Sequence, residues 1–435
     1  MRSFLTILLL AAVGLGAGPA ARADVPDSLG SAAPGLLEFT PLPSPVDSAP
    51  PPPRADSGLV GELHWLSAPF GERLLTEPEA WRDWHHRGGR LEPVVDYNRV
   101  DLFRVGLAGE VQDPSTMAPR LGGRYEYATG RRRGLYGVQL EQPLLPHGRV
   151  AVGVSMSRRT DHSELQQVDD AENSLALLFA RQDYRDYFER EGFGAYAAWR
   201  VPDFSVVSVH ARNDTYRSLA SRSGARSLFL RDHELRDNPP VDEGDLHSWL
   251  VRLERQARRT ARTRAGFYHW IEFERAGYGM GGDFRYTRAL ADLRGVVRLS
   301  PTASLALRAV GGTTPTGALP AQKQFTAGGV DGLRAHAFAQ YRGDQLLLAQ
   351  AEYTTALVQV RPRGFDAGVH AIAFVDAGRA WGDADHGWDP GRQHLQVDGG
   401  FGLATGDQNL RIYAARNLQR PRAGAVFSVR LQRPF

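Results

Sequence analysis

The sequence predicts an all-β fold, an antiparallel transmembrane β-barrel of about sixteen strands with a short N-terminal periplasmic segment. From residue 91 onward, apolar and polar residues alternate with a period of two, as in strands that present one face to lipid and the other to a polar lumen. Short and long connections alternate between these segments. After the N-terminal residues no stretch of about twenty apolar residues follows, so membrane-spanning helices are not expected.

The first predicted region, residues 1–23, has the features of a secretory signal peptide. Arg2 supplies a positive charge, residues 4–16 are largely apolar, and Ala21-Arg22-Ala23 fits a cleavage site. The exported chain would begin after Ala23. The sequence contains no cysteine, which excludes disulfides, cysteine nucleophiles and cysteine-ligated metals.

The second region, residues 24–90, is predicted to be a proline-rich linker followed by a short amphipathic helix. Prolines concentrated in residues 41–53 favour extended backbone. Thr76 and Glu79 form a capping box, and Gly88-Gly89 would end the helix. The helix could lie at the membrane interface, plug the barrel mouth or pack against the barrel rim.

The third region, residues 91–435, is predicted to form the barrel. Strand-like alternation is clear in residues 134–144, 247–254, 288–299 and 305–309, with charges repeatedly on one face. A soluble sandwich would turn that face to solvent, whereas a barrel turns it to a wet lumen. Ser174–Tyr187 is ambiguous: it completes the count of sixteen as a strand, but its apolar spacing also suits a helix.

The connections favour the barrel, because outer-membrane barrels have short turns at one rim and long loops at the other. The short links are residues 201–203, 257–261, 300–303 and 405–407, and the longer ones are 111–120, 217–246, 312–343 and 382–394.

The last strand is the most informative segment. Phe427, Val429 and Leu431 alternate with small or polar residues, and the chain stops at Phe435. A C-terminal strand of this kind, ending in an aromatic residue, is read by the outer-membrane assembly machinery of Gram-negative bacteria.

Two further motifs complete a family pattern. Gly328-Gly329-Val330-Asp331-Gly332-Leu333-Arg334-Ala335-His336 lies in the longest late loop, and residues 374–381, with Asp376 and Gly378, follow two strands later. With the terminal strand and Tyr97-Asn98-Arg99-Val100, these residues resemble the BamA/TamA outer-membrane assembly superfamily, also called bacterial surface antigens. The resemblance covers roughly residues 91–435 and implies an outer-membrane location.

The resemblance implies that the loop folds into the lumen and that Arg334, matching the tip arginine, meets Asp376 on the barrel wall. Alternation places Asp376 inward, and a guanidinium can bind a carboxylate through two parallel hydrogen bonds. In a wet lumen such a pair would position the loop rather than add much stability. Two departures from the family motif, Ala335 for glycine and His336 for an aromatic, are expected to change the loop tip, because alanine lacks glycine's conformational freedom.

A larger departure from the family is N-terminal. Related assembly factors carry periplasmic POTRA modules, and residues 24–90 show no βααββ pattern, so a member without these modules is expected.

No residue pattern predicts catalysis, a cofactor or a metal. His269 and Glu272 would point to opposite faces of a strand. Asp383, Asp385, His386 and Asp389 could bind a cation but lack the spacing of a calcium loop, and His85-His86 suits a helix end. Gly279–Gly282 is a loop tip without the strand-to-helix context of a phosphate cradle.

The expected function is therefore non-enzymatic: insertion or translocation of proteins, or perturbation of the bilayer, through a seam between the first and last strands. Pro434 cannot donate a ladder bond there. The alternatives are a passive channel or structural barrel, and an outer-membrane hydrolase with its site among the long loops. Expected partners are outer-membrane lipid, lipopolysaccharide and unfolded outer-membrane protein clients. Nucleic acid is not expected, since the net charge of +3 is small and unclustered.

Overall fold

The computed structural model describes residues 90–112, 117–145, 149–163, 165–166, 168–201, 205–229, 234–255, 266–358, 368–382, 388–406, 408–420, 422 and 424–431. The predicted signal peptide, the linker and helix before Arg90, and the C-terminal Pro434 and Phe435 lie outside these residues.

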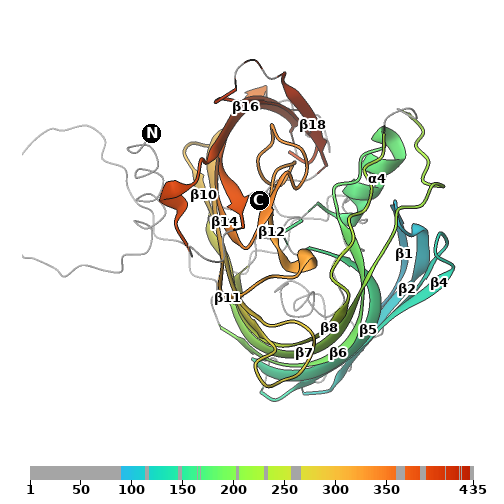
Figure 1. Cartoon of the computed structure of the whole chain (residues 1–435). Coiled ribbons are helices and arrows are strands. Elements are labelled where there is room, and N and C mark those ends of the chain that lie inside the picture. Colours follow the sequence, from blue (N-terminus) through green and yellow to red (C-terminus); the bar gives the residue numbers. More distant parts are fainter. Residues whose placement is uncertain are drawn as a thin grey trace, which may run out of the picture. The chain divides into compact units, whose positions relative to one another are not determined.

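Sixteen strands form one antiparallel sheet in which each strand pairs with its neighbours in chain order (Figure 1). The strands are β1 (Arg90–Asn98), β2 (Leu102–Gln112), β3 (Arg120–Ala128), β4 (Arg133–Pro143), β5 (Val150–His162), β6 (Tyr187–Arg200), β7 (Val206–Ser218), β8 (Gly244–Arg255), β9 (Gly266–Ala276), β10 (Tyr286–Arg298), β11 (Ala303–Gly317), β14 (Gln345–Val358), β15 (Val369–Trp381), β16 (Gln396–Thr405), β17 (Arg411–Asn417) and β18 (Val426–Arg430). This confirms the predicted all-β class and the sixteen strands.

Smaller elements lie in the connections. They are helix α4 (Asp170–Ala180), the 3₁₀ turns η5 (Ala321–Lys323) and η6 (Pro390–Arg392), and the hairpin strands β12 (Phe325–Ala327) and β13 (Tyr341–Gly343). No helix of the described part of the chain combines the length and apolar character needed to cross a membrane.

The strand alternative for Ser174–Tyr187 is wrong, because α4 covers the first half of this segment and β6 begins only at its last residue. The Asp169 carboxylate caps the helix by accepting a hydrogen bond from the Ala171 N–H, and the first turn is acidic, which suits the helix dipole. The sheet reaches sixteen strands without this segment.

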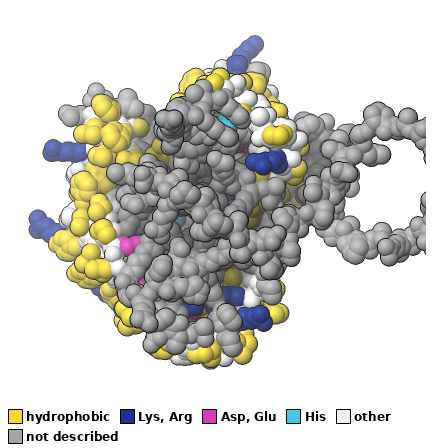
Figure 2. Space-filling view, turned by 180° about the vertical axis from the view of Figure 1, so that it is seen from behind, with side chains coloured by type: hydrophobic (Ala, Val, Ile, Leu, Met, Phe, Trp, Pro, Cys, Tyr) yellow, Lys and Arg dark blue, Asp and Glu magenta, His cyan; other side chains and the backbone are white. Residues whose placement is uncertain are grey.

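The apolar face of the sheet points outward, the reverse of a soluble protein. Leu91, Val138 and Phe427 are exposed, whereas inward carboxylates such as Glu141 and Asp292 are buried. Figure 2 shows hydrophobic side chains gathered along the flanks of the molecule. Inward charges pair across neighbouring strands, as in Arg120–Glu141, Arg252–Glu272 and Arg308–Asp292. A soluble sandwich would bury this apolar face, so the pattern matches a barrel with a polar interior.

The connection between β2 and β3 was predicted to be one of the long loops, but it lies at the end of the sheet that carries the short turns. Connections of an antiparallel sheet in chain order alternate between the two ends. The β2–β3 link, within the predicted long loop 111–120, therefore shares its end with the short turns at 201–205 and 299–302. The long connections at the opposite end include residues 163–186, 219–243 and 318–344.

The hydrogen-bonded order starts at β1 and stops at β18. Over the residues that the structure describes, no ladder joins these two strands. We call the boundary between them the seam.

Candidate functional site

The long connection between β11 and β14 folds onto the inner face of the sheet. Phe325 of β12 is fully buried and packs in the main apolar cluster with Leu333 and Leu346. A Cβ at Gly312 would lie 2.6 Å from the Phe325 ring, so the wall needs glycine at that position. Gly328 has a φ of 121°, which turns the chain into the loop tip, and a Cβ there would lie 2.4 Å from the Ala337 carbonyl oxygen.

Arg334 at the tip contacts Asp376 on β15, as the resemblance implied. Arg334 Nε donates to Asp376 Oδ2 at 2.8 Å and Nη2 donates to Oδ1 at 2.9 Å, a two-bond contact. The third guanidinium nitrogen, Nη1, donates to Glu352 Oε2 at 2.8 Å. The guanidinium carbon also lies 3.7 Å from the centre of the Phe374 ring. Position and orientation of the loop tip are therefore both restrained.

The expectation that this pair is bathed in a wet lumen is wrong. The side chains of Arg334 and Asp376 are 2% and 0% exposed, because the loop itself covers the wall. Burial opposes the charge on Arg334, but the carboxylates of Asp376 and Glu352 outweigh it and raise the guanidinium's pKa. Removing either partner would leave an uncompensated buried charge, so the contact matters for stability as well as for position.

The Arg334 contact belongs to a network over β14, β15 and β17 that sequence reasoning missed. Tyr413 donates its hydroxyl to Glu352 Oε2 at 3.1 Å, and Arg411 donates to Glu352 Oε1. Gln350 Nε2 donates to Asp376 Oδ1 at 3.2 Å. A signal for these residues exists, since Gln350 and Glu352 are alternate inward positions of one strand.

Ala335 and His336, the two departures, meet a second wall acid, Asp398 of β16. Asp398 Oδ2 accepts from the Ala335 N–H at 2.8 Å and lies 3.0 Å from His336 Nδ1. His336 Nε2 lies 3.1 Å from Asn417 Nδ2, and its ring centre is 5.4 Å from that of Tyr341. Ala335 is not among the positive-φ residues, so the tip does not need glycine here. The histidine keeps a ring contact and adds a polar anchor.

The other motif residues have structural places. Gly332 lies close to the Gly328 backbone, and Leu333 is fully buried. A Cβ at Gly378 would lie 2.5 Å from the Leu347 carbonyl oxygen, so β15 needs glycine at that point. In β18, Phe427 and Val429 point outward and are exposed, and Leu431 follows the strand. Their role as an assembly signal stays a prediction.

The sites that the sequence argued against stay without support. Glu272 points inward to Arg252 and Arg288, on the face opposite His269. Gly279, Gly281 and Gly282 adopt positive φ in the β9–β10 turn, as expected of a loop tip. Asp383, Asp385 and His386 lie outside the described residues, and within those residues no group of acids and histidines could hold a metal.

An outward apolar face, inward ion pairs and an inner loop anchored on the wall define the class as an outer-membrane β-barrel. Residues 120–435 match the Omp85 superfamily domain, and the chain belongs to this superfamily of outer-membrane proteins. This confirms the predicted resemblance, since BamA-type barrels are members.

Among solved structures, the chain is similar to BamA from Haemophilus ducreyi lacking POTRA domains 1–3. Identity is 14%, the TM-score is 0.53, and the match covers 80% of this chain and 69% of that one. CdiB from Acinetobacter baumannii matches at 15% identity with a TM-score of 0.40, over 79% of this chain and 60% of that one. CdiB from Escherichia coli matches at 11% with a TM-score of 0.45, over 79% and 62%. The BamA likeness supports the fold alone. No relative among curated protein sequences matches this chain.

Proposed function

We propose that this chain inserts proteins into the outer membrane, or moves them across it, through the seam between β1 and β18, without enzymatic chemistry. The observation that carries the proposal is the lack of a β1–β18 ladder over the described residues. Edge strands carry unpaired N–H and C=O groups that can template a strand of another chain. An unfolded outer-membrane protein is the partner that supplies such strands, with lipid and lipopolysaccharide around the barrel.

The strength of the strand pairing supports the seam as the place of opening. Over the residues that the structure describes, β17 and β18 pair along five residues, Val426–Arg430, whereas β5 and β6 pair along thirteen, Val150–His162. A short ladder can be broken locally while the long ladders of the opposite wall hold the barrel together.

The inner loop counts against the passive channel. Arg334 and Leu333 are buried against the wall, and the hairpin β12–β13 carries the fully buried Phe325. A loop packed in this way narrows the interior, whereas a porin needs an open path.

Export through a signal peptide cleaved near Ala23, and a periplasmic segment up to residue 90, are part of the same proposal.

The test is the rate at which an unfolded barrel client inserts into liposomes that contain the purified protein. The absence of native cysteine permits a thiol cross-link between engineered cysteines in β1 and β18. We expect the protein to accelerate insertion, the cross-link to abolish the acceleration and its cleavage to restore it. Equal insertion with and without the protein would contradict the proposal, and ion conductance under the same conditions would then favour a channel.

A further inference from the structure

Helix α4 covers the seam edge of β1. The backbone N–H of Tyr97, an edge donor of β1, donates to Ser174 Oγ of the helix at 2.9 Å. The Ser174 hydroxyl in turn donates to Asp96 Oδ1 of β1 at 2.6 Å. A serine side chain thus takes the place of the carbonyl that a neighbouring strand would offer. Covering an edge with a helix is one way in which proteins prevent unwanted strand pairing.

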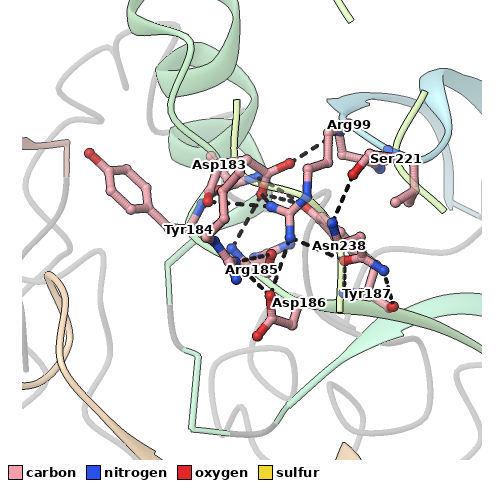
Figure 3. A network of polar contacts seen from close by, with 12 residues as sticks. Arg99, Asp183, Tyr184, Arg185, Asp186, Tyr187, Ser221 and Asn238 are labelled. Carbon is pink, nitrogen blue, oxygen red and sulfur yellow. Dashed lines mark hydrogen bonds and ion pairs between the residues drawn. The ribbon is translucent and has the colours of Figure 1, made fainter. Parts of the chain in front are cut away.

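The segment that follows the helix is hydrogen-bonded to the β1–β2 turn. Arg99 of that turn is fully buried; its N–H donates to Asp183 Oδ2 at 3.1 Å, and its Nη2 donates to Asp186 and Asn238 (Figure 3). Asn173 of α4 donates to Asp183 Oδ1 at 3.1 Å. The helix is therefore joined to β1 through Ser174 and, by way of Asp183, to the β1–β2 turn.

On the other side of the seam, α4 contacts β18 through a pair of charged side chains. Arg430 Nε of β18 donates to Glu172 Oε1 of α4 at 2.6 Å. The side chains of Arg430 and Glu172 are 2% and 4% exposed. Arg430 Nη1 donates further to the Val330 carbonyl at 3.1 Å and to Asp331 Oδ1 at 3.0 Å, both in the inner loop.

We propose that α4 is the gate of the seam, fixed to β1 and latched to β18 by the Glu172–Arg430 pair. This inference rests on the proposed function, because a gate at the seam has a purpose only if proteins pass through the seam. Opening would separate α4 from β18 and free the β18 edge, while β1 stays covered. The latch is releasable because Arg430 keeps Asp331 and the Val330 carbonyl as partners after Glu172 leaves, so its charge is not stranded.

The gate is tested by hydrogen–deuterium exchange of the Glu172→Gln variant in lipid nanodiscs, read by mass spectrometry. We expect amides in residues 426–430 to exchange about tenfold faster than in the wild type, from the loss of a charge-assisted hydrogen bond. The Tyr97 region should exchange at the wild-type rate. The matched control is Glu141→Gln, which removes a buried carboxylate that pairs with Arg120 and Arg200 away from the seam. Wild-type exchange of β18 in Glu172→Gln, or equal acceleration in the control, would overturn the gate.

A second variant guards against misfolding of the first. It carries Glu172→Cys and Arg430→Cys, and a bifunctional thiol reagent that joins the two thiols would hold α4 on β18. Exchange in residues 426–430 should then be at least as slow as in the wild type and rise when the bridge is cleaved. No rise on cleavage would contradict the latch.

The client-insertion assay separates the two proposals. If no form inserts a client but exchange follows the pattern above, the insertion function fails and the gate stands. If the bridged form inserts clients as fast as the cleaved form, the gate fails and the insertion function stands.

Discussion

The wall around β6 and the seam hold the barrel together by different means. β6 pairs with β5 and with β7 over thirteen residues each, through a continuous run of backbone hydrogen bonds. At the seam, β18 pairs with β17 over five of the described residues on one side and contacts α4 through the Arg430–Glu172 side-chain pair on the other. Backbone ladders distribute strength over many bonds, whereas a side-chain latch concentrates it in groups that one substitution can remove. The comparison predicts that substitutions at the seam open it locally, whereas substitutions in the wall lower the stability of the whole barrel.

The largest effect is expected at the loop that touches both regions. Arg334→Ala or Asp376→Ala should each lower the free energy of unfolding by about 3–5 kcal/mol, because each leaves a buried charge without its partner. The double variant should be little worse than either single one, since both remove the same contact. Urea unfolding in detergent, followed by tryptophan fluorescence, measures these differences. Fully additive losses would contradict coupling of the two residues.

A substitution in the wall should lower stability without the local opening that is expected of Glu172→Gln at the seam. Glu272→Gln weakens the buried contacts with Arg252 and Arg288 and should lower the free energy of unfolding by about 2 kcal/mol. Because β9 pairs along its length with β8 and β10, exchange of its amides should rise only with global unfolding. Local opening of β9 as large as that of β18 would remove the distinction between wall and seam.

His336→Phe should have a smaller effect, about 1 kcal/mol, since it keeps a ring beside Tyr341 but loses the contact with Asp398. Limited proteolysis of residues 328–340 should be faster in this variant. Ala335→Gly is the companion variant. Given the ordinary φ of Ala335, it should bring no gain in stability, and a clear gain would show that the tip is strained by alanine.

The smallest effect is expected for Ser174→Ala. It removes an uncharged hydroxyl that accepts from the Tyr97 N–H and donates to Asp96, so exchange of the Tyr97 amide should rise about fivefold while β18 stays at the wild-type rate. This is the mirror image of Glu172→Gln. If either variant accelerated exchange equally in β1 and in β18, α4 would move as one body with both strands. The proposed difference between its two contacts would then be wrong.

Much of the fold and part of the site could be predicted from the amino-acid sequence. Alternation with a period of two is a local property, so it predicted the strands, the outward Phe427 and Val429, and the inward Asp376. The resemblance to the BamA/TamA superfamily, carried by the motif around Arg334, implied its contact with Asp376, and a guanidinium can bind a carboxylate through two parallel hydrogen bonds.

The tertiary structure decided the rest. Whether residues 170–180 are helix or strand could not be read from a short apolar run, since both periods fit it. Burial of the Arg334 pair and the anchoring of His336 by Asp398 depend on the path of the loop over the wall. The Glu172–Arg430 contact joins residues 258 positions apart and depends on where a helix from one loop comes to rest. Periodicity reports which way a side chain points along its own strand, but the chain's path through space selects the partner it meets.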